Sequence, residues 1–418
     1  MKKLTVLFVA LVMVFAALPA FAQDKADWAF YGSARMWTAW ESVDDDTPPQ
    51  LASAGAPGSF FQVGVSKARA YSIGTTTYDD SELAWLLQSN SRVGATVKWG
   101  NIGGRFEYGS APSLRLLYGT WDFGSGKLLV GQDYGSYFYL VSNLCGPGGG
   151  ECNGIGFGSI YPGRIPQLKL LFGGLAISLE QGQTLNSFQG TTTTPILPTT
   201  LLLVNNSTSA AFIETDSQLP RLAASYTFNA GPGQFFIGGQ YNQLKEIYSN
   251  LGSEASNTID AWTLGIGTKL AFGPFYTNAT FQYGKNPNNA GTGPTTLYPS
   301  VALYNPATGF AEDSTYMGAQ LILGFKLHDS MSFEGGVIWQ NGDVNGVGVP
   351  PLNQINYEQS TWTYYLQMTW SPVKNVFIIP EIGIIDFDKL KTSGAAVATP
   401  DLSYGALSWI GIKWQINF

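Results

Sequence analysis

The segment Leu402–Phe418 reads LSYGALSWIGIKWQINF, and its side chains alternate between two kinds of surface. One face carries Tyr404, Ala406, Ser408, Ile410, Ile412, Trp414, Ile416 and Phe418 and becomes more apolar towards the end. The other face carries Leu407, Trp409, Gly411, Lys413, Gln415 and Asn417. A β-strand sends successive side chains to opposite faces. Lipid on one face and a wet lumen on the other require this pattern in a membrane, so the segment predicts a strand of a transmembrane barrel.

The opposite end of the chain has the features of a secretory signal peptide. Lys2-Lys3 precedes the apolar stretch Leu4–Leu18, and Ala20-Phe21-Ala22 forms an A-x-A cleavage site. We expect residues 1–22 to be removed. An uncleaved anchor helix is the alternative, but the apolar run is short for a membrane span and small residues follow it at once. Residues 23–418 are then predicted to form a single outer-membrane β-barrel domain.

The composition is also typical of a barrel. Beyond the signal peptide, the sequence contains no run of the roughly 18 uninterrupted apolar residues that a spanning helix needs. A membrane chain without such runs must pair its backbone groups in a closed barrel. The chain has 50 Gly, 25 Phe, 21 Tyr and 12 Trp, which suit curved strands and aromatic girdles. Charged residues make up only 12% of the sequence, about half of the usual share.

Charge and motifs exclude several classes of function. Loss of the two signal-peptide lysines leaves 20 basic and 29 acidic residues, a formal charge of −9, so we expect no nucleic-acid partner. The single histidine, His328, is adjacent in sequence to Asp329 and Ser330, which is not how a catalytic triad is arranged. The glycine runs lack the Lys-Ser/Thr of a phosphate loop. We predict no enzymatic activity and no cofactor.

The two cysteines, Cys145 and Cys152, lie close together in a chain that is predicted to be exported. An oxidising compartment favours a disulfide between them. A zinc site is the alternative, but zinc requires four ligands, and the sequence offers no second cysteine pair and no histidine nearby. We therefore expect a disulfide and no metal.

Alternating segments separated by turn residues predict sixteen antiparallel strands. An even number places both ends of a single-chain barrel on the same side of the membrane. The predicted strands are Trp28–Trp40, Gln88–Trp99, Ile102–Tyr108, Leu114–Phe123, Lys127–Tyr134, Arg164–Phe172, Leu175–Gln181, Pro220–Phe228, Gln234–Lys245, Thr258–Phe272, Phe275–Gly284, Ser314–Leu327, Met331–Gln340, Thr361–Trp370, Asn375–Phe387 and Leu402–Phe418.

The connections between these strands fall into two classes. Those after even-numbered strands are short, as in Gly100-Asn101 and Gly273-Pro274. Most of those after odd-numbered strands are long, namely Glu41–Leu87, Gly135–Gly163, Gly182–Leu219 and Lys285–Asp313, with the short Gly109–Ser113 link as the exception. Outer-membrane barrels have short periplasmic turns and longer external loops. The alternation of lengths therefore places both termini on the periplasmic side.

Strand parity also predicts the inner surface. In the second strand Arg92, Thr96 and Lys98 share one face, and in the eleventh Asn278, Thr280 and Gln282 do so. These polar faces are expected to line the lumen. A polar lumen that includes small residues favours a channel over a packed core.

In this layout the chain resembles the general bacterial porins, the sixteen-stranded trimeric channels of Gram-negative outer membranes. The resemblance rests on Ser91-Arg92-Val93-Gly94, Leu129-Val130-Gly131-Gln132, the long connection Gly135–Gly163 and the terminal Phe418. It implies a homotrimer in the outer membrane, in contact with lipid and lipopolysaccharide. It also implies that Trp414, Ile416 and Phe418 form the signal that the barrel-assembly machinery reads.

The resemblance assigns Gly135–Gly163 to the third external loop, which folds into such barrels and narrows them. Basic side chains on the barrel wall would face acidic side chains on this loop. The candidate pore-lining basic residues are Arg35, Arg92, Lys98, Arg105 and Arg115, and the candidate acids are Asp133 and Glu151. Arg115 shares its parity with Leu117 and Trp121, so periodicity supports its luminal position less well. Alternatively, these arginines merely line a wide lumen or bind lipopolysaccharide phosphate near the rim.

We therefore expect an outer-membrane porin, a water-filled channel for passive diffusion of small hydrophilic solutes and ions. Pore diameter and fixed luminal charge would do the selecting. The alternatives are a substrate-specific channel for sugars, anions or small acids with a luminal binding site, and a structural or adhesive barrel with a plugged lumen. The porin family's acidic Pro-Glu-Phe-Gly-Gly stretch is absent from the third loop, which carries the segment from Cys145 to Cys152 instead.

Overall fold

The computed structural model describes most of the chain. The described residues are 26–44, 81–110, 113–146, 154–155, 157–182, 211–217, 219–250, 253–292, 300–305, 308–347, 354–394, 402–403 and 405–418. The predicted signal peptide, residues 1–22, lies outside them, as do Glu151 and Cys152. Within these ranges no helix is long and apolar enough to cross a membrane.

Regular structure in the described residues consists of β-strands, most of them in one antiparallel sheet. The first strands are β1 (Asp27–Asp44), β2 (Ser81–Leu87), β3 (Arg92–Trp99), β4 (Ile102–Gly109), β5 (Leu114–Asp122), β6 (Lys127–Tyr134), β7 (Arg164–Phe172) and β8 (Leu175–Glu180). The middle strands are β9 (Ala211–Ser217), β10 (Arg221–Ala230), β11 (Gly233–Asn250), β12 (Ser253–Phe272), β13 (Phe275–Lys285), β14 (Leu303–Asn305) and β15 (Phe310–Glu312). The last strands are β16 (Ser314–His328), β17 (Met331–Val347), β18 (Ile355–Trp370), β19 (Val376–Asp386), β20 (Lys389–Gly394), β21 (Leu402–Ser403) and β22 (Ala406–Asn417).

The sheet closes on itself to form a barrel of sixteen strands. Of its twenty segments, four pairs continue one another along a single barrel strand: β2 with β3, β9 with β10, β19 with β20, and β21 with β22. For example, β2 and β3 pair with successive parts of the same strand, β1. Residues Ser33 to Asp44 of β1 also pair with the whole length of β22, and this pairing closes the barrel. The predicted all-β fold and the count of sixteen strands are therefore confirmed.

The two ends of the barrel have different connections, as the sequence predicts. Ser33 lies opposite Asn417 and Asp27 lies opposite Lys98, so the start of β1 and the end of β22 share one rim. The same rim carries the short turn between Trp99 and Ile102. We call it the short-turn rim and the opposite one the long-loop rim.

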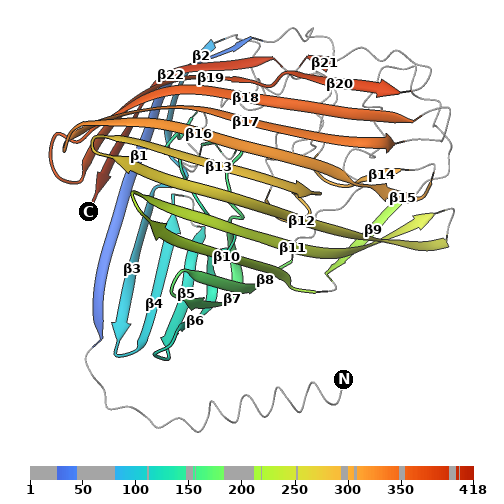
Figure 1. Ribbon diagram of the computed structural model, residues 1–418, viewed down its shortest axis with the longest axis horizontal. Coiled ribbons are helices and arrows are strands. Elements are labelled where there is room, and N and C mark those ends of the chain that lie inside the picture. Colours follow the sequence, from blue (N-terminus) through green and yellow to red (C-terminus); the bar gives the residue numbers. More distant parts are fainter. Residues whose placement is uncertain are drawn as a thin grey trace.

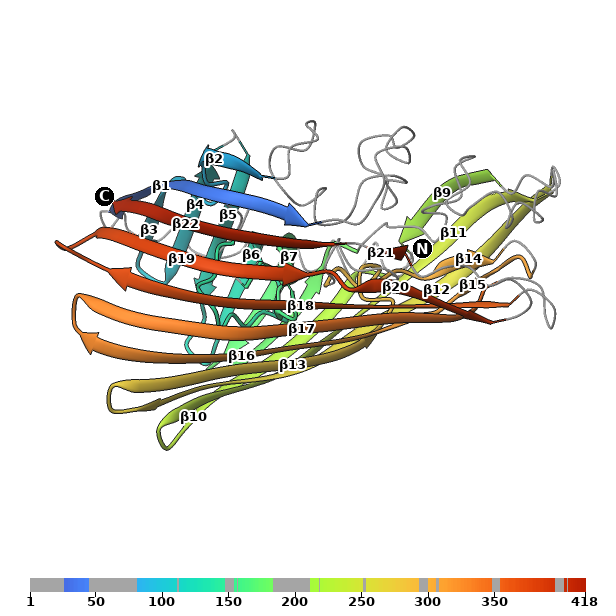
Figure 2. The ribbon, with the colours of Figure 1, turned by 90° about the horizontal axis from the view of Figure 1, so that it is seen from above.

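The wall is much taller on one side than on the other (Figure 1). The short wall, β3 to β8, has strands of six to nine residues. On the tall wall, β11, β12, β16, β17 and β18 have fifteen to twenty residues, and β13 lies between them. Figure 2 shows the tall-wall strands running side by side as long, gently curved ribbons. The tall wall offers a larger inner surface for segments that fold inwards.

The alternation of side chains along each strand separates an apolar outer face from an inner face that is largely polar on the tall wall. Outward positions are exposed and apolar on every side of the barrel, as in Val93, Leu117, Ile237, Leu321, Leu366 and Ile410. Inward positions on the tall wall are largely polar and buried, as in Gln240, Thr263, Gln282, Gln320, Thr361 and Thr363. Exposed apolar side chains are stable where lipid covers them. Burial of the inward positions shows that other parts of the chain cover this wall.

Candidate functional site

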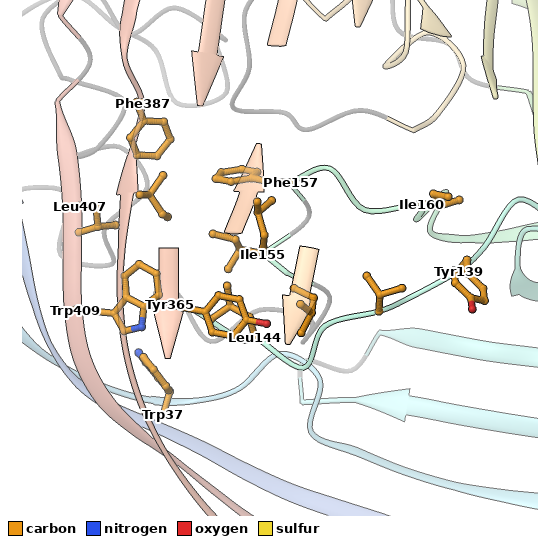
Figure 3. Packing of buried hydrophobic residues seen from close by; sticks show 14 of the residues in the cluster. Trp37, Tyr139, Leu144, Ile155, Phe157, Ile160, Tyr365, Phe387, Leu407 and Trp409 are labelled. Atoms are coloured by element: carbon orange, nitrogen blue, oxygen red, sulfur yellow. The ribbon is translucent and has the colours of Figure 1, made fainter. Parts of the chain in front are cut away.

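The described parts of the third loop, residues 135–146, 154–155 and 157–163, pack against the inner face of the barrel, mainly on the tall wall and on the neighbouring strands β19, β22 and β1. The loop side chains Tyr137, Tyr139, Leu144, Phe157 and Ile160 are buried in one apolar cluster with residues of the wall. Figure 3 shows this packing around wall residues that include Trp37, Tyr365, Phe387, Leu407 and Trp409. Burial of each such aromatic or aliphatic side chain contributes about 1.5–3 kcal/mol. Apolar packing therefore holds the described parts of the loop against the wall.

This cluster corrects one expectation. Leu407 and Trp409 face inwards, as the alternation of the last strand predicts, but they are buried under apolar residues rather than wetted by the lumen. The inner surface is polar in some places and apolar in others, and the apolar part lies where the third loop packs. Two-residue periodicity gives the face of a side chain but not what covers that face.

Polar side chains of the wall bind the backbone of the third loop. On β13, Asn278 Nδ2 donates to Val141 O (2.9 Å), Thr280 Oγ1 to Gly158 O (3.2 Å) and Gln282 Nε2 to Ser159 O (3.0 Å). On β16, Gln320 Nε2 donates to Phe157 O (2.5 Å). The luminal orientation predicted for the three β13 residues is confirmed. Their amide and hydroxyl groups satisfy loop carbonyls that would otherwise be buried without a partner.

Two glutamates of the wall accept hydrogen bonds from the same loop. Glu334 on β17 accepts Asn143 N (3.3 Å), and its carboxylate also accepts the Tyr365 hydroxyl (2.7 Å). Glu381 on β19 accepts Cys145 N (3.4 Å) and Gly146 N (3.1 Å), together with the indole of Trp409. These two carboxylates are directed at the loop backbone. Their role was not predicted, although inward parity on their strands was a signal for it.

Three of the predicted basic residues, Arg92, Arg105 and Arg115, lie on β3, β4 and β5, across the barrel from β13, whose polar side chains bind the third loop. Around the closed sheet, β4 and β13 are eight barrel strands apart, half of the circumference. Arg92 Nη1, Arg105 Nη2 and Arg115 Nε lie 3.5, 3.1 and 2.7 Å from the carboxylate of Glu107 on β4. Tyr31 donates its hydroxyl to the same carboxylate (2.9 Å). We call Arg92, Arg105, Arg115 and Glu107 the arginine cluster.

Arg115 reaches the cluster because of a β-bulge. The register between β4 and β5 shifts between Glu107 and Tyr108, so that Glu107 lies opposite Leu116 and Tyr108 lies opposite Leu114. A bulge re-aims the extra residue on its strand. Arg115 is therefore directed at Glu107, whereas simple alternation from Leu117 would turn it outwards. The bulge explains why periodicity gave weaker support for this arginine than for the others.

The exposures within the arginine cluster differ. The side chain of Arg105 is 33% exposed and that of Arg92 is 19% exposed, whereas those of Arg115 and Glu107 are buried. Among the described residues, three guanidinium groups surround this one carboxylate. The two partly exposed arginines present positive charge to the lumen, because they share the inward face with Glu107.

The remaining predicted site residues lie apart from the cluster. Arg35 on β1 donates to Ser33 Oγ (2.8 Å). Lys98 is exposed near the short-turn rim. Asp133 on β6 pairs with Lys169 (3.0 Å) rather than with one of the predicted arginines. The acid that the arginines meet is therefore Glu107 on the wall itself. Glu107 shares the parity of Arg105, a signal that the sequence interpretation did not use.

His328 is the exposed last residue of β16, next to the turn that leads into β17. Its Nδ1 is 3.1 Å from Ser330 Oγ, while the Asp329 carboxylate pairs with Lys326 (3.0 Å). The acid therefore points to a lysine rather than to the imidazole. Among the described residues, no group of three or more His, Cys, Asp or Glu side chains could hold a metal ion.

Two solved structures with a similar fold place this architecture among known proteins. The outer membrane channel DcaP of Acinetobacter baumannii aligns with a TM-score of 0.58 at 15% identity, over 96% of this chain and 100% of that one. The loop L8 deletion mutant of OmpT, an outer membrane protein of Vibrio cholerae, aligns with a TM-score of 0.51 at 11% identity, over 94% and 100%. No family model and no curated protein sequence matches the chain. The fold is thus that of bacterial outer-membrane barrels.

Proposed function

We propose that the protein is a porin of a Gram-negative outer membrane, a water-filled channel for passive diffusion of small hydrophilic solutes and ions. The observation that carries the proposal is the layout of the inner face. The described parts of the third loop pack on the inner face of the barrel, and half of the circumference away from β13 three arginines around Glu107 face the lumen. A constricted pore with fixed charge selects by size and by electrostatics.

Other parts of the proposal follow from the same fold. The apolar outer face suits contact with membrane lipid and lipopolysaccharide. The sequence features of residues 1–22 support their removal as a signal peptide, and the resemblance to the general porins supports insertion by the barrel-assembly machinery and assembly as a homotrimer. Sedimentation of the detergent-solubilised protein as a monomer would contradict the trimer. His328, whose neighbouring acid binds a lysine, supports a channel without enzymatic activity.

The channel is expected to show weak anion preference or near neutrality, in spite of a mature formal charge of −9. Charges on exposed loops are screened within about 8 Å at physiological salt, whereas a narrow, low-dielectric passage screens charge least. Replacement of Arg92 and Arg105 with Ser should abolish the anion preference, because only the Arg115–Glu107 pair would remain. The reversal potential in a planar bilayer under a salt gradient measures this change.

Lys98→Ser is the matched control for this double substitution, because it removes a positive charge near the short-turn rim, away from the cluster. We expect its reversal potential to stay close to that of the wild type. A reversal potential that the Arg92→Ser, Arg105→Ser variant leaves unchanged would place these arginines away from the narrowing.

We also propose that Cys145 and Cys152 form a disulfide within the third loop. Cys145 lies where the loop meets the wall, with its Sγ 3.2 Å from Lys413 Nζ and its N–H directed at Glu381. Cys152 lies outside the described residues, so the bond remains a prediction. Thiol titration of the unfolded, unreduced protein should detect no free thiol, with the Cys145→Ser, Cys152→Ser variant as the blank. Two reactive thiols would refute the bond.

A further inference from the structure

A second loop also packs on the inner face of the tall wall. We call residues 286–313 loop 6; they connect β13 to β16 and contain the small hairpin of β14 and β15. The described residues Val301, Ala302, Leu303 and Tyr304 are all buried. If the hairpin extended from the rim into solvent, these side chains would be exposed to water. Their burial shows that the hairpin packs against an apolar surface of the protein.

That apolar surface is the inner face of the wall. Ala302 packs with Leu244 and Ile259, which are inward residues of β11 and β12. Val301 and Leu303 pack with Val344, Tyr357 and Leu390 on β17, β18 and β20. The Tyr304 ring lies edge-on to that of Tyr248, with centroids 5.3 Å apart. Each of these wall residues has the inward parity of its strand, so loop 6 covers positions that would otherwise line the lumen.

Hydrogen bonds fix loop 6 to the same strands. Gln240 Nε2 donates to Ala290 O (2.5 Å) and Thr292 Oγ1 (2.8 Å). Asn242 Nδ2 donates to Asn289 O (2.7 Å), and the hydroxyls of Thr263 and Thr292 are 2.9 Å apart. Asn289 Oδ1 in turn accepts Ala302 N (2.9 Å), which joins the two arms of the loop.

Loop 6 and the third loop occupy successive levels along the same strands. On β11, Phe236 packs with the third loop, and Gln240 and Asn242 bind loop 6 further towards the long-loop rim. On β17, Ile338 packs with the third loop and Val344 with loop 6. The described parts of the two loops therefore line successive levels of the tall wall.

A buried ion pair joins the two loops. Glu180, at the end of β8, binds Arg221, at the start of β10, through Nε (2.8 Å) and Nη2 (2.6 Å), and both side chains are 0% exposed. Glu180 Oε1 accepts Ser136 N of the third loop (2.8 Å). Arg221 Nη1 donates to Ala290 O of loop 6 (3.0 Å). Arg221 donates both bonds to Oε2 of Glu180, which leaves Oε1 for the third loop, and the pair holds both loops at the edge of the tall wall.

We propose that loop 6 is a second size-limiting element of the pore, placed between the third loop and the long-loop rim. Two packed β-layers stand about 10 Å apart, so a hairpin on the inner wall removes a layer of that depth from the lumen. Solutes that enter from the long-loop rim would therefore meet loop 6 first and the third loop next. The inference rests on the proposed channel function.

The first test shortens loop 6 by replacing residues 287–312 with a brief Gly-Ser linker. Single-channel conductance should rise about twofold or more, since resistance falls as the passage widens. Liposome swelling should then admit larger sugars than the wild type admits. Heat-modifiable migration on a gel establishes that the variant is folded.

A milder variant serves if the shortened chain folds poorly. Gln240→Ala with Asn242→Ala removes three hydrogen bonds to loop 6 and leaves the loop sequence intact. Release of the loop should produce current fluctuations between two conductance levels. Tyr241→Phe with Gln243→Ala is the matched control, because these residues lie on the same strand with outward parity. Its current should stay as steady as that of the wild type.

The outcomes separate the two proposals. A wild-type protein that forms no channel overturns the proposed function. A wild-type channel whose conductance and sugar limit are the same in the shortened and the Gln240, Asn242 variants overturns the role of loop 6. A larger conductance and a larger sugar limit in the shortened variant support that role.

Discussion

Deletion of Phe418 is expected to leave a chain that reaches the periplasm but inserts poorly. The last residue closes the barrel against β1: Phe418 N donates to Gly32 O (3.0 Å), and Gly32 N donates to Phe418 O (2.6 Å). The Phe418 ring lies over Gly32, where a Cβ would be 2.3 Å from the ring, and it is 69% exposed on the outer face. Without this residue the junction between β22 and β1 loses both of these backbone hydrogen bonds. Each unsatisfied backbone group in lipid costs several kcal/mol.

Heat-modifiable migration on a gel measures the fraction of closed barrels, which should fall below that of the wild type, because the ratio of closed to open chains drops about tenfold for each 1.4 kcal/mol lost. Phe418→Tyr is the matched control, because it keeps both backbone bonds and an aromatic ring above Gly32. It should migrate as the wild type does. Normal migration of the truncated protein would show that closure does not depend on Phe418.

Replacement of Glu107 with Gln should destabilise the folded barrel by about 3–5 kcal/mol and should shift selectivity towards anions. Glu107 is the buried counter-charge of three arginines, with contacts of 2.7 to 3.5 Å. Its loss deprives the buried guanidinium of Arg115, whose side chain is 3% exposed, of the carboxylate 2.7 Å from its Nε. Arg92 and Arg105 keep contact with the lumen, so their charge attracts anions more strongly once the carboxylate is neutral.

Denaturant unfolding in detergent measures the stability change, and the reversal potential measures the selectivity. Adding Arg115→Met to Glu107→Gln should restore most of the stability, because it removes the buried cation that has lost its contact with the Glu107 carboxylate. The anion preference should persist in this double variant. Asp122→Asn at the exposed Asp122–Lys127 pair is the control, with an expected cost below about 1 kcal/mol. If Arg115→Met restores no stability, the cost has a source other than the lost contact between Arg115 and Glu107.

The sequence alone was sufficient to predict the barrel. Side-chain alternation in segments such as Leu402–Phe418 has a period of two residues, so it is visible within a single strand. The phase of short and long connections gave the shared rim of the two termini, and the number of alternating segments gave sixteen strands, both of which the structure confirms. Lipid imposes these features on each strand separately, because each outward residue must be apolar and each backbone group paired.

Tertiary structure decided what happens inside the barrel. Periodicity correctly predicted that Leu407 and Trp409 face inwards. It could not predict their burial, which involves a loop more than 200 residues earlier in the chain. Arg115 meets Glu107 because a bulge breaks the alternation locally, which no count of parity reveals. Arg221 and Glu180, which bind both inward loops, are 41 residues apart and carry no shared motif. Long-range packing chooses such partners by shape and by charge, whereas strand periodicity records only which face of the wall each side chain occupies.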